Sequence, residues 1–368
     1  MEGLLIAFFA SFIAALFIVV SQSFHGRFTN DHDFDSIQKF HVAAVPRIGG
    51  IAIYAGLLFA WLWQFLYKSS FIPELGWILV SALPIFCAGL SEDITKKISA
   101  KLRLYISFLS AAFVYFFIHV HFSRIDWPWV DQNIFALPIV SFAATLFVVG
   151  GTVHALNLID GFNGLMPGAS LLMFAAIGCV SFFVNDSLVL HLSLTCFGAI
   201  AGFFILNFPH GKIFAGDSGA YFIGFLLSTL VLMLVDRNPM VSAWFPCLLL
   251  VYPIFETMFS IYRKVIIRKM AAMQPDGMHL HMLIYKKITR FQMAGRKESL
   301  INAVTSPYLW LLSLIGIVPA VIFWNNTWMT IGFCLLFTLI YLQLYWSLVF
   351  SRNIYRLFRK FAYKNARH

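Results

Sequence analysis

Residues 214–237 read FAGDSGAYFIGFLLSTLVLMLVDR, and this stretch decides the fold class. From Ser218 to Val235 it contains no charged residue. Its length approaches the ~20 residues that a helix needs to cross ~30 Å of hydrocarbon. Asp217 stands directly before the apolar run, with a glycine on either side of the Asp-Ser pair. An ionised carboxylate beside hydrocarbon is costly, so we treat Asp217 as a functional candidate.

Comparable apolar segments recur along the whole chain. Hydrophobic residues make up 60% of the 368 residues and charged residues 11%, and the mean hydropathy is +0.82. No ordinary soluble domain is this apolar. We therefore expect an all-α, polytopic membrane bundle of about eleven transmembrane helices, with 1–368 forming a single integral membrane domain. The predicted spans are 3–20, 48–66, 75–91, 103–120, 134–152, 167–184, 187–206, 219–235, 241–261, 307–324 and 328–350, of which 134–152 is interrupted by Pro138 and Gly150-Gly151.

The basic residues indicate how these spans are oriented. With alternate loops on opposite sides, all 26 Lys and Arg residues except Lys68, Arg124 and Arg237 fall on one side. An excess of Lys and Arg marks the cytoplasmic side of a membrane protein. The sequence therefore predicts an external N-terminus, a cytoplasmic C-terminus and a basic tail over 351–368 that lies at the membrane surface. The net charge of +10 belongs to this face, where it attracts anionic lipids and phosphorylated substrates, and it does not indicate nucleic acid.

The polar candidates all lie in the loops assigned to the basic side. Arg47, in the first of these loops, is either an anion contact or an arginine whose charge extends to the membrane interface. The second loop pairs Glu92 with Asp93 and continues with four cations that include Lys101 and Arg103. Paired carboxylates beside cations suit a hydrated divalent metal with phosphates, and a solvated loop explains the pattern equally well.

The third loop carries Asn157, Asp160 and Asn163 at three-residue spacing and contains no Lys or Arg. On a helical turn these side chains would share one face, which predicts a substrate or metal face. In the fourth loop Lys212 precedes Asp217. An aspartate at that position could also do no more than cap the following helix.

The fifth loop contains His279 and His281 two residues apart. Because residues at this spacing do not share a helical face, the pair is not a helical zinc motif. The two rings either donate hydrogen bonds to phosphate or sugar, or are ordinary loop histidines. Glu256 lies within an apolar run and is predicted to face the interior of the bundle.

In this order and spacing, the motifs resemble the polyprenyl-phosphate N-acetylhexosamine-1-phosphate transferases of the MraY and WecA type, glycosyltransferase family 4. The resemblance covers about residues 41–285. It rests on His41 with Pro46-Arg-Ile-Gly-Gly50, Glu92-Asp93 with Lys101 and Arg103, Asn157-x-x-Asp160-Gly-x-Asn163-Gly-Leu165, Phe214-x-Gly-Asp217-x-Gly219, Pro253-Ile-Phe-Glu256 and Asp276-x-x-His279-x-His281.

The resemblance implies a reaction and a place for it. A HexNAc-1-phosphate would pass from a UDP-N-acetylhexosamine to undecaprenyl phosphate, with release of UMP, and this step would initiate a cell-envelope polysaccharide such as an O-antigen or exopolysaccharide. The family's cofactor is Mg²⁺, with Mn²⁺ as a substitute. The resemblance also implies an active site at the cytoplasmic face of the bacterial inner membrane, and it leaves a homodimer open.

The resemblance further assigns roles to residues. Asp217 matches the metal ligand, and the acid that acts on the lipid phosphate matches Asp93. The catalytic set is Glu92, Asp93, Asp160 and Asp217, and the substrate-binding set is Asn157, Asn163, His279, His281, Lys101, Arg47 and Lys212.

The chain departs from the family pattern at four positions. Glu92 and Asn163 stand where the family usually has Asp, Gly277 replaces a frequent Arg and Met282 replaces a third histidine. The last two departures, Gly277 and Met282, favour a different or modified hexosamine. Two alternatives stay open, an inactive paralogue and a membrane transporter of an anionic solute, although a transporter would place its charges near the membrane midplane.

Overall fold

A computed structural model describes residues 1–31, 44–67, 72–271, 276–291 and 298–365, so His41 lies outside the described residues. The elements are α1 (Glu2–Val20), α2 (Gln22–Thr29), β1 (Asn30–Asp31), β2 (Val45–Pro46), α3 (Gly49–Leu66), α4 (Ile72–Thr95), α5 (Ala100–Phe113), η1 (Val114–Ile118), α6 (Pro128–Val130), η2 (Asp131–Phe135), α7 (Pro138–Ile159), α8 (Leu165–Phe183), α9 (Ser187–Asn207), α10 (Gly216–Arg237), α11 (Phe245–Leu249), α12 (Val251–Tyr262), η3 (Arg263–Ile267), α13 (Leu280–Phe291), α14 (Glu298–Ile322) and α15 (Thr327–Asn365).

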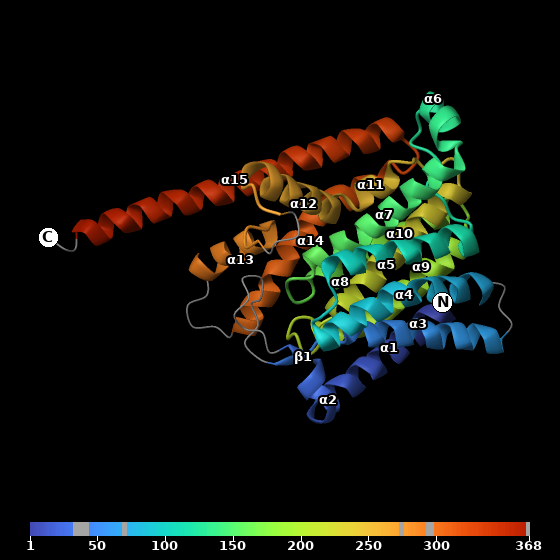
Figure 1. The fold of residues 1–368 in the computed structure, drawn as a ribbon, viewed down its shortest axis with the longest axis horizontal. Helices are drawn as coiled ribbons and strands as arrows, with labels where there is room; N and C mark the ends of the chain where they lie inside the picture. The colour runs from blue at the N-terminus through green and yellow to red at the C-terminus, as the bar shows by residue number, and fades with distance from the viewer. Residues whose placement is uncertain (32–43, 68–71, 272–275, 292–297, 366–368) are drawn as a thin grey trace.

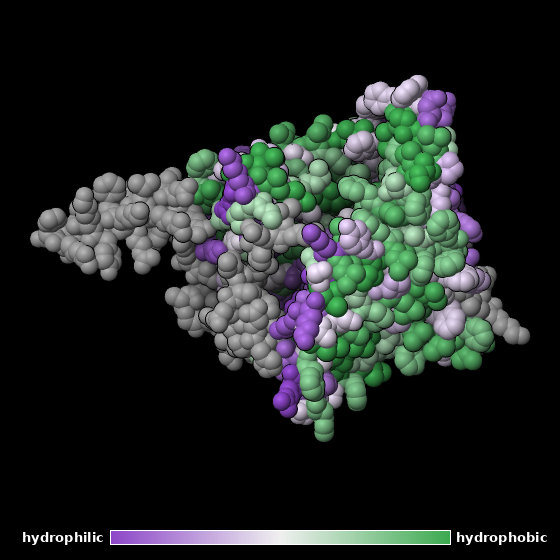
Figure 2. Space-filling model, viewed as in Figure 1, coloured by the Kyte–Doolittle hydropathy of each residue, from purple (hydrophilic) through white to green (hydrophobic). Residues whose placement is uncertain are grey.

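The chain is a polytopic helical membrane protein. In the described part of the chain, ten helices are long and apolar enough to cross a membrane. Apolar side chains cover the side of the bundle seen in Figure 2, and a band of hydrophilic residues borders the end nearest β1 and α13. The loops assigned above to the basic side gather at that end, while the N-terminus lies at the opposite end (Figure 1).

Helix α10 forms the centre of the bundle. Every residue from Gly216 to Val235 is buried, although the helix carries the apolar run that first suggested a membrane span. It packs against α3, α4, α7, α8 and α9. A fully apolar helix surrounded by other helices is a buried core helix rather than a lipid-facing one. The N-terminus of α10, which carries Asp217, is thereby fixed within the protein.

Helix α7 runs through the interruptions expected in segment 134–152. It begins at Pro138, which occupies the first helical turn, where a missing N–H does no harm. Gly150 lies within the helix, and a Cβ there would come within 2.7 Å of the Phe108 ring on α5. The glycine therefore permits close helix packing and does not end the helix. As a result α7 extends seven residues beyond the predicted boundary at 152, to Ile159.

The predicted span 241–261 is not a single helix. It is divided at Leu250 into α11 and α12, with η3 continuing to Ile267. Pro253 explains the division, because it has no N–H with which to bond the carbonyl of Leu249 and so breaks the helical ladder at that point.

A short strand pair joins the end of α2 to the entry to α3, and a backbone bond from this pair reaches the start of α10. Asn30 pairs with Pro46 and Asp31 with Val45 in an antiparallel register. The carbonyl of Pro46 also accepts from the backbone N–H of Phe214 at 2.9 Å. These bonds place Arg47 beside the first turn of α10.

Candidate active site

The side chain of Asp93 holds the N-terminus of α10. Its Oδ1 accepts from the backbone N–H of Asp217 at 2.7 Å, and its Oδ2 accepts from the backbone N–H and the hydroxyl of Ser218 at 2.9 and 2.7 Å. Gly89, one turn earlier on α4, permits this approach, since a Cβ there would lie 2.6 Å from the Cα of Ser218. A carboxylate at a helix N-terminus satisfies free N–H groups and complements the helix dipole. Asp93, not Asp217, therefore caps α10.

Two arginines face the carboxylate of Asp217. Its Oδ1 accepts from Nη2 of Arg47 at 2.8 Å, and its Oδ2 is paired with Nη1 of Arg103. Arg47 also approaches Asp93, with 3.4 Å between Nε and Oδ1. Two acids and two guanidinium groups thus meet at the polar end of the bundle and balance in charge.

Asp160 differs from these two acids in its surroundings. It follows the last residue of α7 and is partly exposed, and no hydrogen bond or ion pair to its side chain occurs among the described residues. Burial raises the pKa of Asp160 to about 7, the charge of Arg47 opposes this rise, and the charges of Asp217 and Asp93 add to it. A carboxylate with a raised pKa and no protein partner among the described residues is typical of a functional site.

The expectation that Asn157, Asp160 and Asn163 share one helical face is wrong. Helix α7 ends at Ile159, and the chain then turns, so only Asn157 lies within the helix. Asn163 is 5% exposed, and its Nδ2 donates to the carbonyl of Pro209 at 3.2 Å.

Backbone contacts of Asn163 explain why its side chain turns inward. Its N–H donates to Oδ1 of Asn302 at 2.7 Å, and its carbonyl accepts from the hydroxyl of Ser306 at 2.6 Å. The residue therefore ties the α7–α8 turn to α14 and to the connection after α9. These contacts give Asn163 a scaffold role, in which the amide supplies a donor that an aspartate would lack, and its contact with substrate stays a prediction.

Glu256 is fully buried, which confirms that it faces the bundle interior. Its Oε2 accepts from the hydroxyl of Tyr341 at 2.6 Å, and its Oε1 lies 3.0 Å from Nδ1 of His279. Because a carboxylate only accepts, His279 carries its proton on Nδ1. Glu256 therefore fixes the orientation of His279 from within the bundle.

The two histidines stack against each other. His279 precedes α13, so helical spacing does not separate the rings, whose centroids lie 5.3 Å apart at an interplanar angle of 5°. Burial and the charge of His279 lower the pKa of His281 to about 3, so its ring is neutral at pH 7. A Cβ on Gly161 would lie 3.3 Å from Nε2 of His281, which shows that the ring reaches the turn beside Asp160.

Arginines anchor the loop that carries these histidines. Asp276 bonds Arg263 at 2.6 Å and Arg268 at 2.9 Å. Burial alone would raise the pKa of Asp276, but the hydrogen bond and charge of Arg263 and the charge of Arg268 hold it below its ordinary value. The matching motif residue Asp276 is therefore a structural anchor.

The other predicted residues lie nearer the surface. Oε2 of Glu92 accepts from the backbone N–H of Ile98 at 2.7 Å, so this acid closes the turn between α4 and α5. Lys101 and Lys212 are exposed, and no side-chain bond of either is found among the described residues. Both ammonium groups remain available to an anionic ligand.

Sequence reasoning named Arg103 as a motif residue without a role in the site, and it missed two residues near Arg103 and Asp217, Tyr221 and His154. The guanidinium of Arg103 lies 5.9 Å from the centroid of the Tyr221 ring, and the His154 ring packs edge-on against the same ring at 5.3 Å. His154 lies within electrostatic reach of Arg103 and Asp217. An ionisable residue at the end of an apolar segment was the available signal for His154. No signal in the sequence indicated a role for Tyr221.

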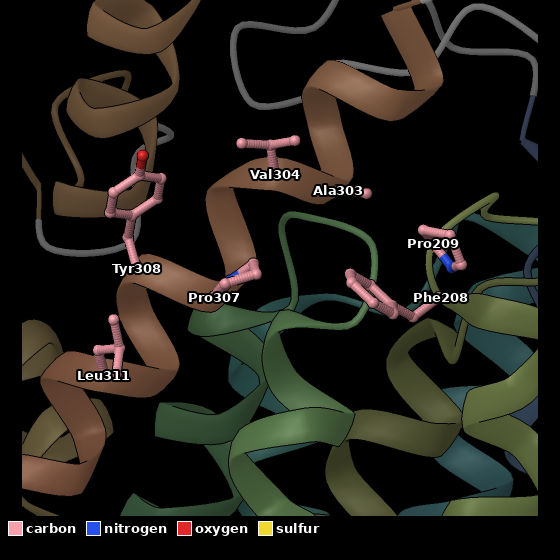
Figure 3. A pocket seen from close by; sticks show the side chains of 7 residues that line it. All are labelled: Phe208, Pro209, Ala303, Val304, Pro307, Tyr308 and Leu311. Atoms are coloured by element: carbon pink, nitrogen blue, oxygen red, sulfur yellow. The ribbon is translucent and has the colours of Figure 1, made fainter.

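An apolar groove of about 380 Å³ lies between α14 and the connection that follows α9 (Figure 3). Its lining contains no charged side chain, so it suits an apolar ligand and not a nucleotide. Pro209 in its wall accepts the hydrogen bond from Asn163, which connects the groove to the α7–α8 turn. The lining residues are Phe208, Pro209, Ala303, Val304, Pro307, Tyr308 and Leu311.

The donor set fits a magnesium ion better than a zinc ion. Among the described residues no three His, Cys, Asp or Glu side chains converge as metal ligands. Mg²⁺ commonly takes one or two carboxylates and completes its shell with water and substrate phosphates. Asp217 could supply such a carboxylate once a guanidinium leaves one of its oxygens.

Comparison with known proteins agrees with this site. A profile of glycosyl transferase family 4 matches residues 75–235, which include Asp93, Asp160 and Asp217. The chain is 28% identical over 314 residues to a probable undecaprenyl-phosphate N-acetylglucosaminyl 1-phosphate transferase of Bacillus subtilis (strain 168), covering 85% of this chain and 82% of the relative.

Two further relatives carry a similar name, undecaprenyl-phosphate alpha-N-acetylglucosaminyl 1-phosphate transferase. The protein from Yersinia pestis is 27% identical over 325 residues, covering 84% of this chain and 82% of its own length. The protein from Escherichia coli (strain K12) is 28% identical over 267 residues, which is 69% of each chain. The profile match over residues 75–235 and these relatives support placing the chain with glycosyl transferase family 4, as a phosphoglycosyltransferase.

Proposed function

We propose that this enzyme transfers a HexNAc-1-phosphate from a UDP-N-acetylhexosamine to undecaprenyl phosphate, with Mg²⁺ as cofactor and UMP as the leaving product. The observation that carries the proposal is the meeting of Asp217, Asp93, Arg47 and Arg103 at one polar end of an apolar bundle. A lipid phosphate and a nucleotide can meet only where the membrane surface and a charged site coincide.

The chemistry demands charge neutralisation more than covalent catalysis. An oxygen of the lipid phosphate dianion attacks the β-phosphorus of the donor, and the bond from that phosphorus to the bridging oxygen breaks as UMP leaves. Arg47 and Arg103 are placed to bind the diphosphate oxygens, because guanidinium groups bond phosphate in a bidentate way. Bound Mg²⁺ would supply further neutralisation of the diphosphate.

Other residues position the reactants. Asp93 keeps Asp217 in place through the backbone of α10. His279, whose Nδ1 proton faces Glu256, and neutral His281 lie near the turn that bears Asp160, where they suit the sugar phosphate. Lys101 and Lys212 are exposed cations for the lipid phosphate or the nucleotide.

We infer N-acetylglucosamine as the first sugar to test, because the relatives named above act on it by name. Met282, one reason to expect a modified hexosamine, is only 2% exposed, so its side chain belongs to the core. We further propose that the site faces the cytoplasm at the bacterial inner membrane and that the product initiates an envelope polysaccharide. The grouping of the basic loops at one end supports this orientation.

The test is UMP release by purified protein supplied with undecaprenyl phosphate, Mg²⁺ and a panel of UDP-sugars. The Asp217→Asn variant should lose release, whereas Asp236→Asn, at the far end of the same helix, should retain it. The proposal fails if the wild-type protein releases no UMP with any donor of the panel.

A further inference from the structure

The carboxylate of Asp217 has no free oxygen. Arg47 occupies Oδ1 and Arg103 occupies Oδ2, and the Asp217 side chain is only 8% exposed. A divalent cation that binds Asp217 must therefore displace a guanidinium or share an oxygen with it. Sharing would bring two like charges within a few ångströms of each other in a partly buried site, which is unfavourable.

The two arginines are not held equally. Arg47 contacts both Asp217 and Asp93, and its backbone N–H donates to the carbonyl of Thr29 at 2.9 Å. Arg103 projects from the first turn of α5, and among the described residues its ion-pair partner is Asp217. Its Nε is buried without a hydrogen-bond acceptor in the described part of the chain. A buried donor without an acceptor is a costly arrangement that an anionic ligand would relieve.

We propose that Arg103 is an exchangeable counter-ion. It neutralises Asp217 in the free enzyme and moves onto the donor diphosphate when Asp217 takes up the metal. Mg²⁺ brings two positive charges and a UDP-sugar diphosphate brings two negative charges, so the exchange leaves the site neutral at both stages. Tyr221, whose ring lies 5.9 Å from the guanidinium, provides a surface along which Arg103 can shift while staying in contact.

The exchange makes Arg103 an inhibitor of metal binding and a promoter of donor binding. The exchange rests on the proposed function, because Arg103 moves onto the diphosphate of the UDP-sugar. An ordinary phosphate-binding arginine would aid the donor but leave the affinity of the free enzyme for metal unchanged. The affinity of the free enzyme for metal and its affinity for the donor can be measured separately.

The experiment measures Mn²⁺ binding to the free enzyme by electron paramagnetic resonance and UDP binding by calorimetry. A hydrogen bond to a charged group is worth about tenfold or more in affinity. For Arg103→Gln we expect Mn²⁺ to bind about tenfold more tightly without nucleotide and UDP to bind about tenfold more weakly. Lys97→Gln is the matched control, because it removes the same charge from an exposed position in the connection that precedes α5.

Unchanged or weaker Mn²⁺ binding by Arg103→Gln overturns the exchange. If this variant does not survive purification, Arg103→Lys replaces it, since a lysine keeps the charge but lacks the planar fork. Mn²⁺ should then still bind more tightly than to the wild type, and equal affinity overturns the proposal. If the wild type releases UMP and Arg103→Gln leaves the Mn²⁺ affinity unchanged, only the exchange is rejected. If the wild type binds no Mn²⁺ and releases no UMP, both proposals are rejected.

Discussion

Replacing Asp93 with asparagine tests whether this acid acts through the helix that it caps. The asparagine side chain keeps one carbonyl oxygen for the N–H of Asp217, and its amide could donate to the Ser218 hydroxyl in place of accepting from it. The backbone N–H of Ser218 is then left without an acceptor. An unsatisfied buried donor costs about 1–3 kcal/mol, and loss of the charge at the helix N-terminus adds about 0.3–1 kcal/mol.

We therefore expect Asp93→Asn to lose about 1–4 kcal/mol of stability, seen as a lower midpoint of thermal unfolding in detergent. Release of the first turn of α10 also displaces Asp217, and a shift of about 1 Å at a catalytic group can lower turnover about 100-fold. Stability and activity should thus fall together.

Ser218→Ala is the companion variant, because it removes only the hydroxyl bond to Asp93. In a double-mutant cycle the two substitutions should be non-additive in stability, since they share one hydrogen-bond network. An Asp93→Asn variant that unfolds at the wild-type temperature but releases no UMP would refute the reasoning. Asp93 would then act directly on the substrate.

Three further predictions address the acids and the amide around this site. Asp160→Asn should raise the unfolding temperature at pH 8 but not at pH 4. The pKa of Asp160 is raised from 3.8 to about 7, so its buried charge destabilises the wild type increasingly above pH 4 and fully above pH 7. A pH series of unfolding scans checks this, and a difference between variant and wild type that grows toward acid pH would contradict it. Asn163→Asp should lower stability by about 1–3 kcal/mol, because it removes the donor to Pro209 and sets a carboxylate against a carbonyl 3.2 Å away. An unchanged unfolding temperature would argue against the scaffold role. Chelation by EDTA should leave the unfolding temperature of the substrate-free enzyme unchanged, since Arg47 and Arg103 already neutralise Asp217, and a marked fall would show that a resident metal holds the site.

The apolar runs and the Lys and Arg distribution were sufficient to predict a helical membrane bundle and to group the polar loops. They could not predict the division at Leu250, because hydropathy averages over the residues and does not register one missing N–H at Pro253. The same averaging placed the end of α7 near 152, although Gly150 there serves helix packing.

Residue types in the site were easier to find than their roles. Asp93 and Asp217 look alike in sequence, each an acid near a glycine at the end of an apolar segment. Their separation into a helix cap and an arginine-bound carboxylate depends on the approach of α4 to α10, which no local pattern records. Asn163 was likewise assigned to the substrate by its spacing, whereas its partners come from α14 and from the connection after α9.

The arrangement explains why an acid is kept at each of these two positions in so apolar a protein. A single carboxylate at the start of α10 would have to satisfy the helix N–H groups and pair with two guanidinium groups at once. Asp93 takes the first task with both oxygens, which leaves the carboxylate of Asp217 to face Arg47 and Arg103. Asp93 thereby holds the backbone of Asp217 in place, and in the proposed exchange only the partners of the Asp217 carboxylate change. Asp93→Asn should therefore lose activity because Asp217 is displaced, and Arg103→Gln because a positive charge beside Asp217 is removed. The two variants should differ in unfolding temperature even where both lose activity.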